Sequence, residues 1–157
     1  MSVHPLFLIV VFDGLRSDMV TADAMPNLYR FMTDGTSFPN ARTVYPSSTR
    51  TAAAALATGS SPRRNGIVQN KYFDPNVFED RMFQPNQASD IAAGLSAYGG
   101  ELFTTPCLGD LAAEAGYRMA TILSGSCGTS RLLNPRAPER GDISLGFGGW
   151  EDSCPPG

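Results

Sequence analysis

A threonine hydroxyl stands at the start of a short predicted helix. Residues 46–59 read Pro-Ser-Ser-Thr-Arg-Thr-Ala-Ala-Ala-Ala-Leu-Ala-Thr-Gly, so Thr49 precedes or begins an alanine-rich helix that ends at Gly59. The N–H groups at a helix start lack backbone partners and carry partial positive charge, so an anion binds well there. A hydroxyl in that place either caps the helix or attacks a bound anionic substrate. The choice depends on what the rest of the chain places beside Thr49.

A carboxylate is the second candidate group. The continuous apolar run Leu6–Phe12 ends at Asp13 and Gly14, and it predicts a strand buried on both faces of a parallel sheet. Open α/β sheets bind ligands at the C-terminal ends of such strands, although an aspartate before a glycine is also a common turn residue. If Asp13 and Thr49 converge, their oxygens could bind one divalent metal, Zn²⁺, Mn²⁺ or Mg²⁺, which would lower the pKa of the hydroxyl.

The remaining elements predict an α/β fold with a mostly parallel sheet flanked by helices. Segments with helical periodicity and Pro or Gly at their ends alternate with short apolar segments that predict strands. Residues 71–103 are rich in Pro and Gly and predict an irregular excursion that contains a short helix near 88–97. Further helices are expected at 25–35, 106–116 and near 129–133, and strands at 37–45, 117–123 and 143–147.

Composition limits the possible functions. The chain has 157 residues, a net charge of −3, 42% hydrophobic and 17% charged residues, which suits a single globular domain. Such a charge gives no electrostatic case for a nucleic acid polymer or an anionic membrane surface. No apolar run is long enough to span a bilayer, and no signal peptide is recognisable, so a cytoplasmic protein is the default expectation.

An ordered set of short motifs extends over nearly the whole chain, most clearly over residues 6–74. In order they are Val-Val-Phe-Asp-Gly-Leu-Arg-Ser-Asp-Met at 10–19, Met-Pro-Asn-Leu at 25–28, Tyr-Pro-Ser-Ser-Thr-Arg at 45–50, Ala-Thr-Gly at 57–59 and Gly-Ile-Val-Gln-Asn at 66–70. Each motif alone is weak, but their order and spacing resemble the type I phosphodiesterase/nucleotide pyrophosphatase branch of the alkaline phosphatase superfamily. The resemblance implies an alkaline-phosphatase-like core and a hydrolase that acts on a small phosphorylated substrate such as a nucleotide.

The resemblance also implies roles for individual residues. Asp13 corresponds to the first metal ligand, and Thr49 corresponds to the nucleophile, which also contacts a metal. Asn70 corresponds to an asparagine whose amide donates to a phosphoryl oxygen; without the motif set it reads as a turn or strand-end residue. The implied cofactors are two divalent metal ions, with zinc expected.

Three departures from the family pattern bear on function. Arg50 stands where nucleotide-cleaving members have an aromatic residue; its guanidinium could contact a second phosphate or a carboxylate, stack on a base, or stay solvated. The chain has a single histidine, His4, whereas the family completes its zinc sites with several. No closing element precedes Gly157. Residues 1–157 are therefore expected to be the N-terminal part of a single catalytic domain, inactive alone.

Three alternatives remain. Ser60–Arg64 fits the Ser-x-Pro-x-Arg pattern that sulfatases oxidise, but it follows the Thr-Gly pair at 58–59 instead of preceding it, so a sulfatase is not expected. Phosphonate or phosphomonoester hydrolysis would use the same Asp13 and Thr49. A non-catalytic domain would reduce Thr49 to a cap and Asp13 to a turn residue.

Overall fold

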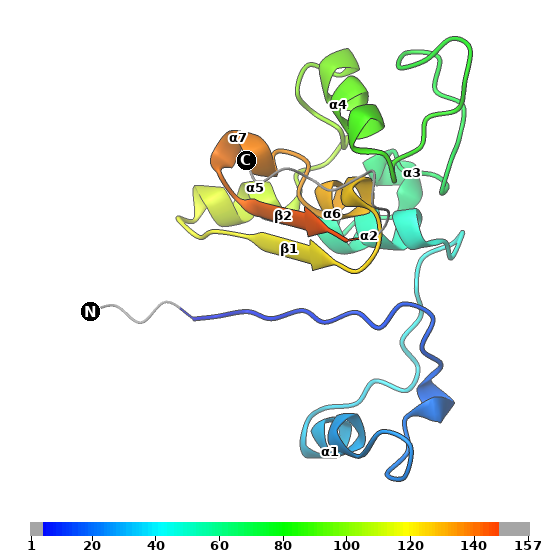
Figure 1. Ribbon diagram of the computed structural model, residues 1–157, viewed down its shortest axis with the longest axis vertical. Coiled ribbons are helices and arrows are strands. Elements are labelled where there is room, and N and C mark those ends of the chain that lie inside the picture. The colour runs from blue at the N-terminus through cyan, green and yellow to red at the C-terminus, as the bar shows by residue number, and fades with distance from the viewer. Residues whose placement is uncertain (1–4, 148–157) are drawn as a thin grey trace. The chain divides into compact units, whose positions relative to one another are not determined.

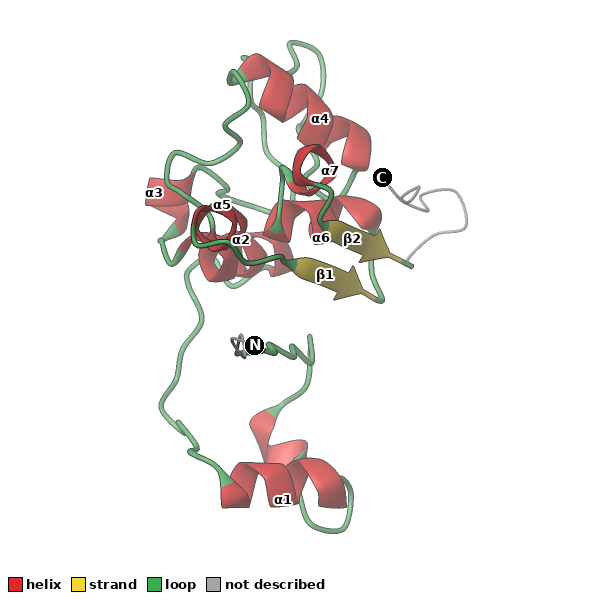
Figure 2. Ribbon diagram, turned by 90° about the vertical axis from the view of Figure 1, so that its left-hand side faces the viewer, coloured by secondary structure: helices red, strands yellow, loops and turns green. Residues whose placement is uncertain are grey.

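The computed structural model describes residues 5–147, so His4 lies outside the described residues. Helices predominate, and the strands are few and short (Figures 1 and 2). In chain order the elements are η1 Ser17–Met19, α1 Pro26–Asp34, α2 Thr49–Thr58, α3 Pro62–Asn65, α4 Ala88–Ala97, α5 Leu108–Glu114, β1 Ala120–Leu123, α6 Cys127–Leu133, α7 Ala137–Arg140 and β2 Ile143–Gly146.

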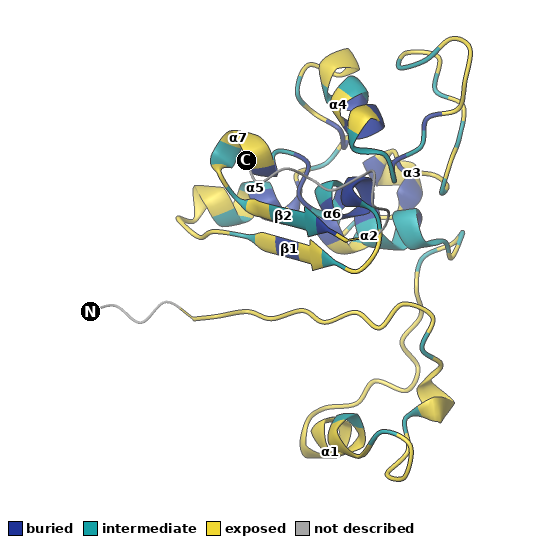
Figure 3. Ribbon diagram, viewed as in Figure 1, coloured by how far each residue is buried: buried dark blue, intermediate teal, exposed yellow. Residues whose placement is uncertain are grey.

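The chain divides into two compact units, residues 1–42 and 43–157. The described part of the first unit contains η1 and α1, and neither helix buries a residue (Figure 3). The side chains of Leu6 to Phe12 are between 55% and 92% exposed, and this segment is extended without being a strand. The predicted buried strand is therefore wrong here: a strand needs a ladder partner, and within residues 5–147 this segment has none. Residues 37–45 likewise form no strand.

Helix α2 opens the second unit and confirms the predicted helix at 49–57. Ser48 is its N-cap, and Gly59 ends it in the left-handed conformation at φ 60°, which glycine adopts without steric cost. The alanines on its inner face let the helix approach its neighbours closely, and Ala54 and Ala57 are buried. Local sequence signals thus suffice to define both ends of this helix.

Strands β1 and β2 form a parallel pair, with Ala120 opposite Ile143 and Leu123 opposite Gly146. Helix α6 lies between them in sequence and packs against both strands, α2 and α4. Its buried Ser130 hydroxyl lies 3.1 Å from the Thr121 carbonyl oxygen and 3.1 Å from the Ser144 hydroxyl, which ties α6 to both strands. The α/β class with a parallel sheet and flanking helices is confirmed, but the sheet has only two strands within residues 5–147. The full alkaline-phosphatase core stays a prediction, as does the single domain over 1–157.

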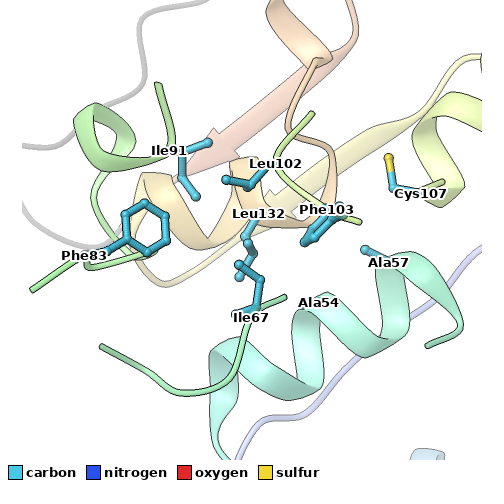
Figure 4. Close-up of a cluster of buried hydrophobic side chains, with 9 residues drawn as sticks. All are labelled: Ala54, Ala57, Ile67, Phe83, Ile91, Leu102, Phe103, Cys107 and Leu132. Atoms are coloured by element: carbon cyan, nitrogen blue, oxygen red, sulfur yellow. The ribbon is translucent and has the colours of Figure 1, made fainter. Parts of the chain in front are cut away.

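One hydrophobic cluster fills the second unit (Figure 4). Its members come from α2, α4, α6 and the segments between them, so residues far apart in sequence pack together. The cluster consists of Ala54, Ala57, Ile67, Phe83, Ile91, Leu102, Phe103, Cys107 and Leu132.

The predicted excursion at 71–103 is irregular but anchored, and its helix is α4. Tyr72 and Phe83 pair through backbone hydrogen bonds of 3.1 and 2.8 Å. Asp90, buried in the first turn of α4, accepts two bonds of 2.8 Å from the Arg81 guanidinium and one of 2.8 Å from the Gln84 N–H. These bonds hold the excursion to the second unit.

Charged side chains join α5, α7 and the segments beside them. Asp110 Oδ1 lies 2.7 Å from both Arg136 Nη2 and Arg140 Nη1, while its Oδ2 accepts from the Cys107 thiol at 3.1 Å. Burial by itself raises the pKa of Asp110, but the bonds from Cys107, Arg136 and Arg140 outweigh it and lower the pKa to about 2.

Asp142, which is 3% exposed, continues this cluster between α7 and β2. Its carboxylate accepts from Arg118 Nε at 2.9 Å, Arg140 Nε at 3.3 Å and Asn134 Nδ2 at 3.1 Å. Burial raises the pKa of Asp142, and these donors lower it below its ordinary value. We call Asp110, Arg118, Arg136, Arg140 and Asp142 the ion network.

Candidate functional site

The start of α2 places Thr49 as the first helical residue, directly after its cap. Ser48 has extended dihedral angles, φ −115° and ψ 154°, and forms a capping box with Thr51. The Ser48 N–H donates to Thr51 Oγ1 at 3.2 Å, and the two hydroxyls lie 2.9 Å apart. The capping role that Thr49 might have taken therefore belongs to Ser48 and Thr51.

Thr51 also ties the preceding turn to the helix. It is fully buried, and its hydroxyl lies 2.6 Å from the carbonyl oxygen of Pro46. Because Thr49 is enclosed between the Pro46–Ser48 turn and Thr51, this bond fixes the backbone that carries it. Ser48 and Thr51 were not among the predicted site residues. Their signal in the sequence is the capping-box spacing, with Thr51 in the place usually held by Glu or Gln.

The side chain of Asn70 reaches the same helix start from the loop that follows α3. Its side-chain Oδ1 accepts a hydrogen bond of 3.1 Å from the backbone N–H of Arg50. Because Oδ1 is engaged, the Nδ2 group is the part of the amide that remains to donate, and no hydrogen bond from Nδ2 is found in the described part of the chain. The structure thus brings the Asn70 side chain to the first turn of α2, and its role toward a phosphoryl oxygen stays a prediction.

Asn65 stabilises the segment that connects α2 to Asn70. Its buried amide donates to the Ser60 carbonyl oxygen at 2.9 Å and accepts from the Ile67 N–H at 2.9 Å. Ile67 is buried in the core at 1% exposure. This turn leads the chain back toward the helix start, so Asn65 acts on the position of Asn70 through the backbone.

Asp13 belongs to the first unit and Thr49 to the second. Their convergence on one metal therefore stays a prediction. Among residues 5–147, no group of three or more His, Cys, Asp or Glu side chains is close enough to hold a metal ion. The described residues do not complete a metal site, and Asp13 and Thr49 are the two predicted donors they contain.

Arg50 follows Thr49 in the first turn of α2. Its Nε atom is buried without a hydrogen-bond partner. No ion pair between Arg50 and a carboxylate is found within residues 5–147. By contrast, Arg136 and Arg140 of the ion network each pair with an aspartate. The sequence left four roles open for this guanidinium, and the structure adds that its Nε is shielded from water.

Ser60, the sulfatase alternative, lies at the opposite end of α2. It follows the C-cap Gly59, and its hydroxyl lies 3.3 Å from the Thr58 carbonyl oxygen. A helix of 10 residues spans about 15 Å, so Ser60 is remote from the start of α2 where Thr49 and Asn70 meet. The geometry agrees with the position argument against a sulfatase.

Comparison with known proteins identifies the family of this chain. A sequence profile of the type I phosphodiesterase/nucleotide pyrophosphatase family matches residues 7–152. The bis(5'-adenosyl)-triphosphatase enpp4 of Xenopus laevis is 34% identical over 76 residues, which make up 48% of this chain and 17% of that protein. The chain thus matches under a fifth of that relative, and no solved structure matches it significantly. None of the helices within residues 5–147 has the length and apolarity needed to cross a membrane. Because the profile covers nearly its whole length, the chain belongs to the type I phosphodiesterase/nucleotide pyrophosphatase family.

Proposed function

We propose that the intact protein hydrolyses phosphoric esters or anhydrides with Thr49 as its nucleophile. Family membership supports the reaction class. The observation that carries the residue assignment is the 3.1 Å bond from the Arg50 N–H to Asn70 Oδ1, since it brings a side-chain amide to the helix start that carries Thr49. The start of α2 does not need Thr49 as a cap, because Ser48 and Thr51 fill that role.

The proposed chemistry follows from this arrangement. A phosphoryl group bound at the α2 start receives a hydrogen bond from Asn70 Nδ2 and lies at the positive end of the helix dipole. Thr49 Oγ1 attacks phosphorus, the bond to the leaving oxygen breaks, and the hydroxyl proton passes through solvent to the leaving group. Water then hydrolyses the phosphothreonine. Asn70 contributes most when charge develops on the phosphoryl oxygens in the transition state.

We also propose that the intact protein binds two divalent metal ions, zinc first among the candidates, with Asp13 and Thr49 among the ligands. A bound metal would lower the pKa of the threonine hydroxyl and offset charge on the phosphoryl group. The described residues supply two donors of that set and no cluster of three, so the metal requirement rests on the family.

The substrate is proposed to be a small phosphorylated compound. The frog relative is named as a bis(5'-adenosyl)-triphosphatase, which makes nucleotide anhydrides the first compounds to test. Phosphonates and phosphomonoesters are the second candidates, because Asp13 and Thr49 would serve them equally. Relative rates on mono- and bis-(p-nitrophenyl) phosphate and on a dinucleoside triphosphate separate these classes.

The decisive experiment measures turnover by the intact protein with Thr49 replaced. Thr49→Ala is expected to lower kcat at least about 10³-fold with an unchanged melting temperature, and Thr49→Ser to retain part of the activity. Ser60→Ala, at the other end of α2, is the matched control and should leave kcat unchanged. Normal turnover by Thr49→Ala would sink the assignment, and loss on Ser60→Ala would revive the sulfatase alternative.

A further inference from the structure

We propose that Arg50 is a specificity-determining residue whose guanidinium binds a second anionic group of the substrate, beyond the phosphoryl group that Thr49 attacks. The inference rests on the proposed function, since it assumes that the α2 start is the substrate site. It favours substrates with two adjacent anionic groups, such as phosphoric anhydrides, over esters that carry a single negative charge.

The first observation is the shielded Nε of Arg50. This atom is buried and has no hydrogen-bond partner. A buried donor without a partner costs about 1–3 kcal/mol, and more when it belongs to a charged group. No hydrogen bond from the two Nη groups of Arg50 is found within residues 5–147 either, so these groups are left to a ligand.

The second observation is the electrostatic position of Arg50. It is the second residue of α2, where the positive end of the helix dipole disfavours a cation. Arg81, Arg136 and Arg140 each lie 2.7–2.8 Å from a carboxylate oxygen, but no carboxylate partner of Arg50 is found in the described chain. An uncompensated cation at a positive helix end is an arrangement that an anionic ligand stabilises.

The helix geometry directs Arg50 to a second group of the ligand. Successive helical residues are separated by about 100° around the axis, so the side chains of Thr49 and Arg50 diverge from the same turn. The Arg50 backbone N–H is held by Asn70 Oδ1, which fixes the start of its side chain beside the asparagine amide. Thr49 and Asn70 therefore address one phosphoryl group, and Arg50 addresses its neighbour.

Binding of two inorganic probes to the intact protein tests the inference. Isothermal titration is expected to show that the wild type binds inorganic diphosphate at least about 10-fold more tightly than orthophosphate, because a charge-assisted hydrogen bond contributes about 1.5–3 kcal/mol. Arg50→Gln should weaken diphosphate binding about 10- to 100-fold and leave orthophosphate binding within about threefold. Arg50→Lys should be intermediate, and Arg63→Gln, an exposed arginine in α3, is the matched control.

Several results would overturn the inference. Equal loss of both probes in Arg50→Gln would place Arg50 on the attacked group, and no loss of either would make it a solvated side chain. Base stacking would appear in kinetics, as an equal fall of kcat/KM on a dinucleoside triphosphate and on thymidine 5'-p-nitrophenyl phosphate. Failure of the proposed function is separate: it would appear as normal turnover by Thr49→Ala, whatever the binding preference.

Discussion

The α2 start and the ion network use charged and polar groups in opposite ways. In the ion network, Asp110 and Asp142 each accept from several donors, and the donors are satisfied by the same carboxylates. At the α2 start, Asn70 is tied through Oδ1 alone and the Arg50 Nε is shielded without a partner. A closed network of this kind stabilises the fold, while open donors cost stability and suit a ligand.

Perturbed pKa values alone would point to the ion network instead of the α2 start. The pKa values of Asp110 and Asp142 are lowered by structural ion pairs, and burial together with the Asp110 carboxylate raises the pKa of the Cys107 thiol. Strongly shifted groups often mark active sites, but structural networks shift them as well. Here the candidate site is predicted from the family motifs, and Arg50 Nε is one of three buried side-chain atoms without a partner found within residues 5–147.

After Thr49, the largest expected effect is at Asn70. Asn70→Ala in the intact protein removes the Nδ2 donor and should lower kcat about 10²–10³-fold, because such donors act on transition-state charge. The melting temperature should fall only slightly, since the bond lost from the fold, that from the Arg50 N–H to Oδ1, contributes about 1 kcal/mol. Asn76→Ala, in the exposed part of the excursion, is the control. A normal kcat, or a loss of activity that the loss of stability explains, would contradict the catalytic role of Asn70 and the contrast between the α2 start and the ion network.

The ion network should show the reverse pattern. Asp110→Ala leaves Arg136 and Arg140 without their shared carboxylate and should lower the free energy of unfolding by about 3 kcal/mol. Chemical denaturation measures this loss, with the exposed Glu139→Ala as control. At temperatures where the variant is folded, kcat should match the wild type; a specific loss of kcat would place the network in the reaction.

Acid should weaken the ion network. Asp110 has a native pKa of about 2, below the unfolded value of about 3.9, so its contribution of about 2 kcal/mol is present above pH 4 and is lost as pH falls from 4 to 2. The lowered pKa of Asp142 acts in the same direction. Unfolding free energies measured across this range should fall steeply for the wild type and less for Asp110→Asn. An equal fall of the unfolding free energy with pH in the wild type and in Asp110→Asn would show that Asp110 is not the source of the acid sensitivity.

The smallest expected effect is at Thr51, which belongs to the fold of the α2 start. Thr51→Val removes the buried hydroxyl that bonds to the Pro46 carbonyl oxygen and should cost about 1 kcal/mol of stability. Because this bond fixes the backbone around Thr49, kcat should fall as well, by less than for Asn70→Ala. An unchanged kcat together with the expected loss of stability would show that the bond between Thr51 and Pro46 does not affect the position of Thr49.

The sequence predicted those elements whose ends are marked locally. Helices α2 and α4 and strand β2 lie where apolar pattern, capping residues and glycines placed them. Helix α7 was not predicted, since its four residues include Pro138 and the Arg140 ion pairs that hold it are non-local. For Leu6–Phe12, the apolar run predicts a buried strand. A strand also needs a neighbouring strand to pair with, and the local sequence does not specify that partner.

For the candidate site, the resemblance predicted Thr49 and Asn70, and the structure shows the Asn70 side chain hydrogen-bonded to the first turn of α2. The metal roles of Asp13 and Thr49 stay predictions. The shielding of Arg50 Nε could not be predicted, because it depends on how several segments cover one side chain. Side-chain accessibility is a property of the assembled fold and leaves no signature in residue spacing.

The exposed Leu6–Phe12 segment has a practical consequence. Seven apolar residues without proline or charge have the composition of segments that stack into β-aggregates, and Pro5 and Asp13 are the gatekeepers at either end. Replacing Asp13 with alanine would remove one gatekeeper together with a proposed ligand, so precipitation could be mistaken for loss of metal. Asp13→Asn keeps a polar boundary, and zinc content measured on that variant separates coordination from solubility.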